Sequence, residues 1–353
     1  MVSGQVSEVA PAPCIRTGQE TCHDADGGGL DCPGSGQDGE FRAGRCWPQP
    51  RFEVAGDLVR DRLTSLAWPR QASLSEFPLN WAEALEFVAG LNRTGAFGYE
   101  DWRLPNRREL RSLIDHQSAR PALSHGHPFE DVFQGWYWTS TTAVISPAHA
   151  WYVDLGGGRM FYGGKDQSFM VWPVRGPCAL ARSGQLDCYD GAGHGIDCAG
   201  SGQDGQLTVG VAWPAPRFQV LDEGILDRLT GLRWHRSADL AGGPVDWLGA
   251  LAAVDAINRR SAYRWGLPNI NELESLVDCG RYAPALPAAH PFRDTRDTYW
   301  SSTTSAYEPD WAWALYLDKG AVGVGQKREG RFFAWAVARS GVVAGRADLS
   351  NGA

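Results

Sequence analysis

The stretch Gly34-Ser35-Gly36-Gln37-Asp38-Gly39 occurs again, unchanged, as residues 200–205, and this recurrence decides how the chain is organised. Around it, residues 16–70 align with residues 182–236 at a constant offset of 166, with 29 of 55 positions identical. After a three-residue deletion the match resumes at Leu104-Pro105-Asn106 and Leu267-Pro268-Asn269. A period this long indicates a duplicated domain, because the units of solenoid proteins are only about 20 to 50 residues long.

This duplication predicts two domains with a very short link between them. We place the first domain at residues 14–176 and the second at residues 177–340, with an N-terminal extension at 1–13 and a flexible tail at 341–353. Each domain is long enough to bury a hydrophobic core of its own. Because only Arg175-Gly176-Pro177 joins them, we expect the two domains to touch.

Composition narrows the class of protein. The net charge of −8 argues against binding to nucleic acid, which requires a broad basic surface. The chain contains no apolar run of the roughly 18 residues that a membrane-spanning helix needs, so we expect no membrane insertion. Residues 1–5 do not resemble a signal peptide, and we expect that a native leader has been removed from this chain.

The cysteines indicate an oxidising compartment, hence a secreted, periplasmic or cell-surface protein. Cys22 and Cys32 recur at the same spacing as Cys188 and Cys198, so we predict one disulfide in each domain. A zinc site is the alternative, but the CxxC and histidine pairs of such sites are missing. The other cysteines do not repeat, and their connectivity stays open between the candidate pairs Cys14–Cys46 and Cys178–Cys279.

Local patterns predict an α+β domain. Residues 81–91 carry apolar side chains at helical spacing, and residues 247–257 are their counterpart. A second helix is expected after Asn106, which with Glu109 has the spacing of a capping box; Asn269 and Glu272 repeat it. The last third of each copy reads as aromatic strands. We therefore expect two helices and a mainly antiparallel, aromatic-rich sheet in each domain.

Three motifs together resemble the Lcl-type C-terminal domain, found at the ends of bacterial collagen-like adhesins. They are the stretches 101–106 (DWRLPN), 138–141 (WTST) and 172–175 (WPVR). The resemblance covers nearly the whole chain, twice over. It implies a C-type-lectin-like fold, related to that of formylglycine-generating enzymes, and a role in surface adhesion or glycan binding without a reaction. The second copy departs from the pattern, because Gly266 replaces Arg103 and Ala338 replaces Arg175. We therefore expect the ion pair of Arg103 to be missing there.

Aromatic side chains are the first candidates for ligand contact, because their faces stack on sugar C–H surfaces. Trp residues present in both copies, such as Trp138 with Trp300 and Trp172 with Trp335, are expected in the core. Residues that differ between the copies, or that carry polar groups on the late strands, are better candidates. The predicted ligand-binding set is Trp136, His149, Trp151, Lys165, Tyr307, Asp310, Trp311, Trp313 and Lys327.

Three other groups of residues each have a functional and a structural interpretation. Carboxylates in the glycine-rich cysteine loops are the ligands that calcium prefers, namely Asp24, Asp26, Asp31, Asp190 and Asp197. Asx turns explain the same residues, so calcium stays an alternative and no cofactor is required. The basic run Arg107, Arg108 and Arg111 is predicted to be a solvated helix face, with contact to sulfated glycans as the alternative. A hydrolase using His127 or His290 with Ser140 or Ser302 lacks a nucleophile motif.

These observations favour a secreted or cell-surface, non-enzymatic adhesion protein. Its partner is expected to be a glycan or a surface protein, bound by the loops and late strands. The alternative is a structural subunit or assembly module of an extracellular appendage, such as a pilus, sheath or phage-tail-like structure, with self-association through aromatic patches.

Overall fold

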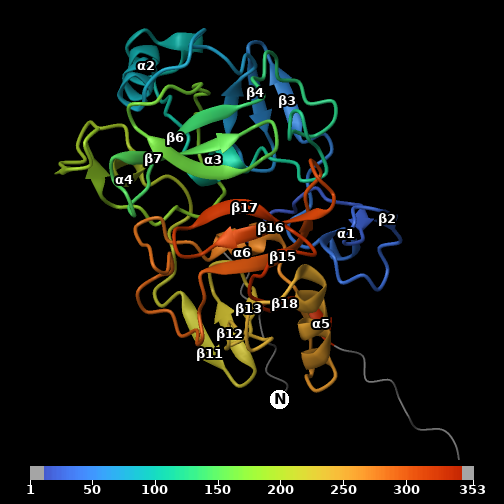
Figure 1. Cartoon of the computed structure of the whole chain (residues 1–353). Coiled ribbons are helices and arrows are strands. Elements are labelled where there is room, and N and C mark those ends of the chain that lie inside the picture. The colour runs from blue at the N-terminus through green and yellow to red at the C-terminus, as the bar shows by residue number, and fades with distance from the viewer. Residues whose placement is uncertain (1–11, 344–353) are drawn as a thin grey trace, which may run out of the picture.

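The computed structural model describes residues 12–343, and both copies run through nearly the same order of elements (Figure 1). The first copy contains β1 (Cys22–His23), β2 (Gly29–Leu30), α1 (Asp38–Phe41), β3 (Phe52–Ala55), β4 (Leu58–Asp61), β5 (Ala67–Pro69), α2 (Trp81–Arg93), η1 (Ala96–Gly98), α3 (Arg107–Arg111), β6 (Trp136–Thr142), β7 (His149–Asp154) and β8 (Met160–Gly164). The second contains β9 (Cys188–Tyr189), β10 (Gly195–Ile196), α4 (Asp204–Leu207), β11 (Phe218–Leu221), β12 (Gly224–Asp227), β13 (Arg233–Trp234), α5 (Trp247–Asn258), β14 (Tyr263–Gly266), α6 (Ile270–Ser275), β15 (Thr298–Thr304), β16 (Trp311–Tyr316), β17 (Ala321–Gln326) and β18 (Val337–Val343). The described chain is thus mixed α+β, with few helices and many antiparallel strands.

The predicted helices form where capping and apolar spacing coincide. In α2, Trp81, Ala84 and Val88 are buried at helical spacing, and Asn80 forms a capping box with Glu83. The capping boxes predicted at Asn106 and Asn269 are also confirmed, and they open α3 and α6. The one-turn helices α1 and α4, in the recurring Gly-Ser-Gly-Gln-Asp-Gly stretch, were not predicted, because four residues are too few to show a helical period.

Aromatic side chains fill the core, as expected for the Trp residues that both copies share. Trp68, Trp138 and Trp172 are fully buried, and so are their counterparts Trp234, Trp300 and Trp335. Trp68 packs edge-on against Trp172 with ring centroids 5.5 Å apart. The His-Pro-Phe turns serve this core, since Phe129 and Phe292 each pack against a buried Trp at 4.8 Å.

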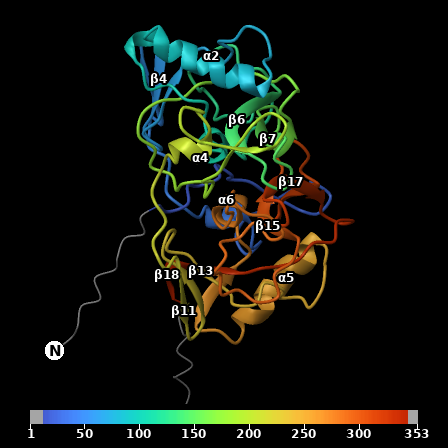
Figure 2. The ribbon, with the colours of Figure 1, turned by 90° about the vertical axis from the view of Figure 1, so that its left-hand side faces the viewer.

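The two copies share one sheet, which confirms the expectation that they touch. Its six strands run in the order β15-β16-β17-β8-β7-β6, all antiparallel. The seam lies between β8 and β17, where Met160 pairs with Val322. Figure 1 shows the green strands of the first copy above the red strands of the second, and Figure 2 shows α2 and α5 at opposite ends of the molecule.

The segments that carry the disulfides are exchanged between the copies. We call residues 14–46 and 180–212 the cystine segments. In the first, the Gln19 side chain exchanges two hydrogen bonds with the backbone of Thr304 in β15, at 2.7 and 2.8 Å. In the second, Gln185 does the same with Thr142 in β6, at 2.8 Å in both bonds. Figure 1 accordingly shows α1 beside the second copy's strands and α4 beside the first copy's. Each copy is completed by a segment of the other.

The two predicted disulfides, Cys22–Cys32 and Cys188–Cys198, are present. The further candidate disulfides Cys14–Cys46 and Cys178–Cys279 are not formed, because all four cysteines are free thiols. That part of the prediction was wrong. Cys14 is turned toward Ser275 of the second copy, whereas Cys46 is exposed. Cys178 lies beside Glu109, and Cys279 is buried near Arg107 and Arg108.

The ends of the described chain change one predicted boundary. Residues 341–343, placed in a flexible tail, continue β18 and pair with β14 through Tyr263 and Val343. The rest of that tail, and residues 1–11 of the predicted N-terminal extension, lie outside the described residues. No helix between residues 12 and 343 has the length and apolar character needed to cross a bilayer.

Candidate functional site

Two buried lysines hold the exchanged cystine segments in place. Lys165 Nζ donates to the carbonyl oxygens of Tyr189 and Asp190 at 3.1 and 3.0 Å. Lys327 Nζ donates to those of His23 and Asp24 at 3.3 and 3.0 Å. Each ammonium group also lies over a Trp ring of its own copy. Lys165 Nζ is 4.1 Å from the ring centroid of Trp81, and Lys327 Nζ is 4.3 Å from that of Trp247. We call these two residues the lysine clamps.

This burial removes four residues from the predicted ligand contacts. Lys165 and Lys327 are 3% and 0% exposed, and Trp151 and Trp313 are each 2% exposed. All four are present in both copies at equivalent positions, and they stabilise the core and the exchange. Burial lowers the pKa of each clamp lysine to about 8.

Two buried aspartates add a second contact to each exchanged segment. Asp38 Oδ2 accepts hydrogen bonds from Thr17 and, across the copies, from Thr303, both at 2.7 Å. Asp204 Oδ2 accepts from Thr141 at 2.7 Å in the mirrored arrangement. Burial raises the pKa of both carboxyl groups to about 6, because no cation pairs with either of them directly.

The carboxylates proposed for calcium are dispersed around their loops. Asp24 Oδ1 accepts from the backbone N–H groups of Asp26 and Gly28 at 2.9 and 2.8 Å, and Asp190 and Asp197 make similar Asx turns. Asp26 forms an ion pair with Arg328 of the other copy, and Asp31 is exposed. Within residues 12–343, no group of three His, Cys, Asp or Glu side chains is arranged to hold a metal ion.

An ion pair beside the Leu-Pro-Asn motif is present in both copies, formed by different arginines. In the first, Arg103 pairs with Glu109 in α3. In the second, Gly266 has no side chain, and Arg339 of β18 reaches Glu272 instead, at 2.7 and 2.8 Å. A Cβ at Gly266 would lie 2.7 Å from the Arg339 guanidinium, so the glycine is what makes room for it. This corrects our expectation that the second copy lacks the pair.

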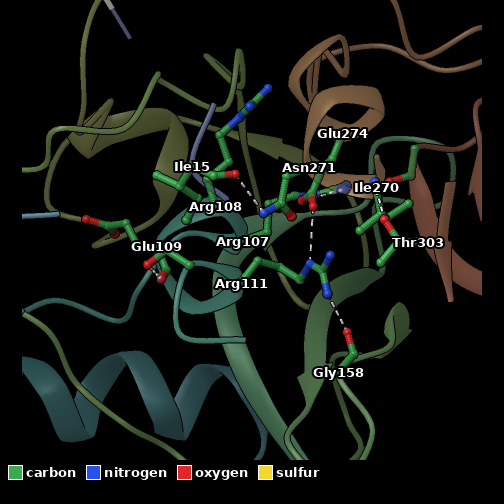
Figure 3. A network of polar contacts seen from close by, with 12 residues as sticks. Ile15, Arg107, Arg108, Glu109, Arg111, Gly158, Ile270, Asn271, Glu274 and Thr303 are labelled. Atoms are coloured by element: carbon green, nitrogen blue, oxygen red, sulfur yellow. Dashed lines mark hydrogen bonds and ion pairs between the residues drawn. The ribbon is translucent and has the colours of Figure 1, made fainter. Parts of the chain in front are cut away.

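The basic run of α3 is buried between the copies, not solvated. Arg107 and Arg111 are 1% and 5% exposed, and Arg108 is half-buried. Arg111 Nε lies 3.1 Å from Glu274 in α6, and Arg107 lies 3.6 Å from the same carboxylate. Figure 3 shows Arg111 extended between Glu274 and the carbonyl of Gly158. The prediction of a solvent-facing basic surface was therefore wrong, because α3 faces α6 rather than water.

The remaining candidates lie on or near the surface. Tyr307 is 42% exposed and stacks on the Arg120 guanidinium, 4.4 Å from its ring centroid. These two residues line a pocket of about 240 Å³ that spans both copies.

The other three candidates lie elsewhere. Asp310 and Trp311 are half-buried near the first cystine segment, and the backbone carbonyl of Asp310 accepts a hydrogen bond from the backbone N–H of Lys327. His149 is half-buried, 2.8 Å from Ser146 Oγ. The structure does not bring these residues into one site.

A stripe of aromatic rings crosses the face of the six-stranded sheet that is opposite to α3 and α6, the same face on which α2 and α5 pack. Trp136 is 45% exposed and stacks on Tyr152 with centroids 4.9 Å apart. Tyr152 pairs with Phe161 across β7 and β8. Phe161 lies 6.3 Å from Tyr316 across the seam, and Tyr316 lies 5.9 Å from Phe332. We call these five residues, all exposed or half-buried, the aromatic stripe.

Glycines of neighbouring strands leave room for these rings to lie along the sheet. A Cβ at Gly163 would meet Tyr152 at 3.1 Å, and one at Gly323 would meet Tyr316 and Phe161 at 2.9 and 3.0 Å. Of the stripe, only Trp136 was a predicted ligand residue. The alternation Trp151-Tyr152-Val153 could have indicated Tyr152, since a strand turns every second side chain to the opposite face.

The histidines weighed for catalysis lie in packing positions. His127 and His290 each pack on the phenylalanine two residues later, with ring centroids 5.9 and 5.8 Å apart. Ser140 and Ser302 are 1% and 0% exposed, within β6 and β15. In the described chain no hydrogen bond joins either histidine to either serine.

Comparison with protein families gives one match, repeated along the chain. The model described as the Lcl C-terminal domain matches residues 57–175 and 223–338, together more than half of the chain. This match confirms the resemblance that the three motifs indicated. Both matched stretches begin after a cystine segment, so the exchanged segments lie outside them. Comparison with curated proteins gives no match.

Proposed function

This chain belongs to the Lcl C-terminal domain family, and from that membership we propose that it is a non-enzymatic binding protein that works outside the cytoplasm and adheres to an extended glycan through the aromatic stripe. The observation that carries the proposal is the row of partly exposed rings from Trp136 to Phe332, which spans both copies. Rings that lie along a sheet present the flat apolar faces on which sugars stack. The two disulfides agree with an extracellular or periplasmic location.

Two finer expectations belong to the same proposal. We assign each copy, predicted at residues 14–176 and 177–340, a C-type-lectin-like fold, with the exchange making one functional unit of the two. We also propose that binding needs no calcium, because the Asp24 and Asp190 carboxylates already accept backbone N–H groups. A thermal unfolding midpoint that rises on adding calcium and falls with EDTA would contradict the second point.

A glycan array, followed by titration of the best glycan, tests the stripe. Trp136→Ala should weaken binding about five-fold, because loss of one aromatic stack costs about 1 kcal/mol. The matched control is Tyr282→Ala, which removes an aromatic residue that is 54% exposed in the second copy and outside the stripe. Equal affinities of the two variants would refute the stripe as the site.

The alternative of an appendage subunit predicts a different outcome. A stable oligomer or filament in size-exclusion chromatography, together with no glycan binding, would favour self-association through the same rings. Specific glycan binding by a monomer would exclude that alternative.

A further inference from the structure

The junction between α3 and α6 holds more positive than negative charge. Three guanidinium groups, those of Arg107, Arg108 and Arg111, meet there, and Glu274 is the only carboxylate of the described chain within 4.0 Å of any of them. The other buried arginines nearby are each paired one to one, as in Arg51–Asp61 and Arg217–Asp227. The junction thus carries an excess of two positive charges.

The charges of the three arginines act on the one carboxylate they share. Burial by itself raises the pKa of Glu274, but Arg111, Arg107 and Arg108 lower it below its ordinary value. Burial also lowers the pKa of Arg108 and Arg111, although the nearby Glu274 carboxylate acts to raise both. Buried charge without a partner is strongly unfavourable, so this excess calls for an anion.

All three arginines have unused donors. Arg107 Nη1, Arg108 Nε and Arg111 Nη2 are buried and make no hydrogen bond, and of these arginines Arg108 and Arg111 line a cavity. Beside them, Ser112 donates to Glu109 O at 2.7 Å, while Glu274 Oε1 accepts no hydrogen bond. Asn271 donates to Ile15 O at 3.2 Å (Figure 3). A buried N–H without a partner costs about 1–3 kcal/mol, so each of these donors requires an acceptor.

A cavity of about 70 Å³ opens between the copies at this place. Arg108, Arg111, Ser112, Asn271 and Glu274 line its polar side, while Ala12, Leu180 and Leu229 line its apolar side. A water needs roughly 10–15 Å³ of such space, so the cavity holds a few waters or one small oxyanion, but not a sugar ring.

We propose that this cavity binds a small inorganic oxyanion of the phosphate or sulfate type, held by Arg108 Nε and Arg111 Nη2. The anion neutralises the excess charge at the junction and satisfies both donors at once. Because residues of both copies line the cavity, the bound anion stabilises the association of the two copies. This site is separate from the aromatic stripe, which lies on the opposite face of the sheet.

Thermal unfolding at constant ionic strength tests the site, with inorganic phosphate as the probe. If phosphate binds at one site, the unfolding midpoint rises with phosphate concentration along a binding curve with a defined Kd. We expect a rise of about 4 °C when the site is nearly fully occupied. General stabilisation by excluded anions instead grows without saturation. Arg108→Gln should lose the saturable part of the rise. The control Arg93→Gln, at a surface ion pair on α2, should keep it.

A second measurement covers the case in which Arg108→Gln does not fold. Crystals of the unaltered protein grown with selenate should show one anomalous peak between Arg108 and Arg111. No peak there, or a midpoint that rises linearly with phosphate in the unaltered protein, would overturn the proposal. Because neither readout involves a glycan, failure here leaves the proposed function untouched.

Discussion

The two copies meet at the junction of α3 and α6 through unlike residues, and they hold their exchanged segments through like residues. Arg111 and Glu274 occupy equivalent positions of α3 and α6, yet one is a cation and the other an anion, and they pair at 3.1 Å. The lysine clamps also occupy equivalent positions, and there both copies use the same residue on the same pair of backbone carbonyls.

Pseudo-symmetry explains this contrast. Each lysine clamp contacts a cystine segment and not the other lysine clamp, so the same residue can form this contact in both copies. At the junction an element faces its own counterpart, and identical charged residues would repel each other there. Divergence of α3 and α6 therefore makes the pairing of one copy with the other favourable, whereas divergence was first expected to mark ligand contact.

The face of the sheet that carries the aromatic stripe differs between the copies in the size of its side chains. Trp136, Tyr152 and Phe161 of the first copy align with Thr298, Ala314 and Gly323 of the second. Of these three, Gly323 leaves space for the Phe161 ring, which a Cβ there would meet at 3.0 Å. Here the expectation that unlike positions carry ligand contact remains a prediction, and the Trp136→Ala titration tests it.

Removing the charge of Glu274 should break the junction and produce the largest effect. Glu274→Gln leaves the buried Arg107 and Arg111 and the half-buried Arg108 without a carboxylate. We expect a loss of about 3–5 kcal/mol in the free energy of unfolding, measured with urea. The control Glu86→Gln breaks the surface pair with Arg93 and should cost less than about 0.5 kcal/mol. The double variant Arg111→Met, Glu274→Met should recover part of the loss. A cost below about 1 kcal/mol for Glu274→Gln would show that the junction does not depend on this pair.

Replacing each lysine clamp tests whether the two exchanged segments are held equally. Lys165→Met and Lys327→Met each remove two hydrogen bonds from a charged donor to carbonyl groups that keep one other donor. We expect each variant to cost about 2 kcal/mol of unfolding free energy. Proteolysis of the released cystine segment should accelerate in parallel. Lys319→Met, at a half-buried lysine, is the control. If the losses of unfolding free energy differ by more than about 1 kcal/mol, the two lysine clamps do not hold their cystine segments equally.

The pH dependence of stability gives the smallest expected effect and tests the shared aspartates. The pKa of Asp38 and Asp204 is raised to about 6 in the folded chain, so the folded state binds more protons than the unfolded state between about pH 4 and 6. Their contribution therefore increases as the pH falls from 7.5 to 5, by about 1 kcal/mol for each carboxylate. Asp38→Asn and Asp204→Asn should each flatten that slope in urea titrations. Unchanged slopes in both variants would assign the pH dependence to other groups.

Local features of the fold were predictable from the sequence because their partners are close along the chain. The capping boxes at Asn106 and Asn269 need only a residue three positions away, and the disulfides close loops with a sequence separation of 10. The buried Trp residues were predictable for a related reason, since large apolar side chains that both copies keep belong in the core. Arg339 could not be assigned in this way, because its partner Glu272 is 67 residues away and the motif position is a glycine.

By itself, the sequence determined the duplication, the capped helices, the disulfides and the family. Only the tertiary structure decided that the cystine segments are exchanged, that the basic run is interior and that the rings of both copies form one stripe. The physical reason is that a lysine or arginine is buried only where other groups satisfy its charge. Here those groups come from the other copy: Lys327 donates to Asp24, which is 303 residues away, and Arg111 pairs with Glu274, which is 163 residues away.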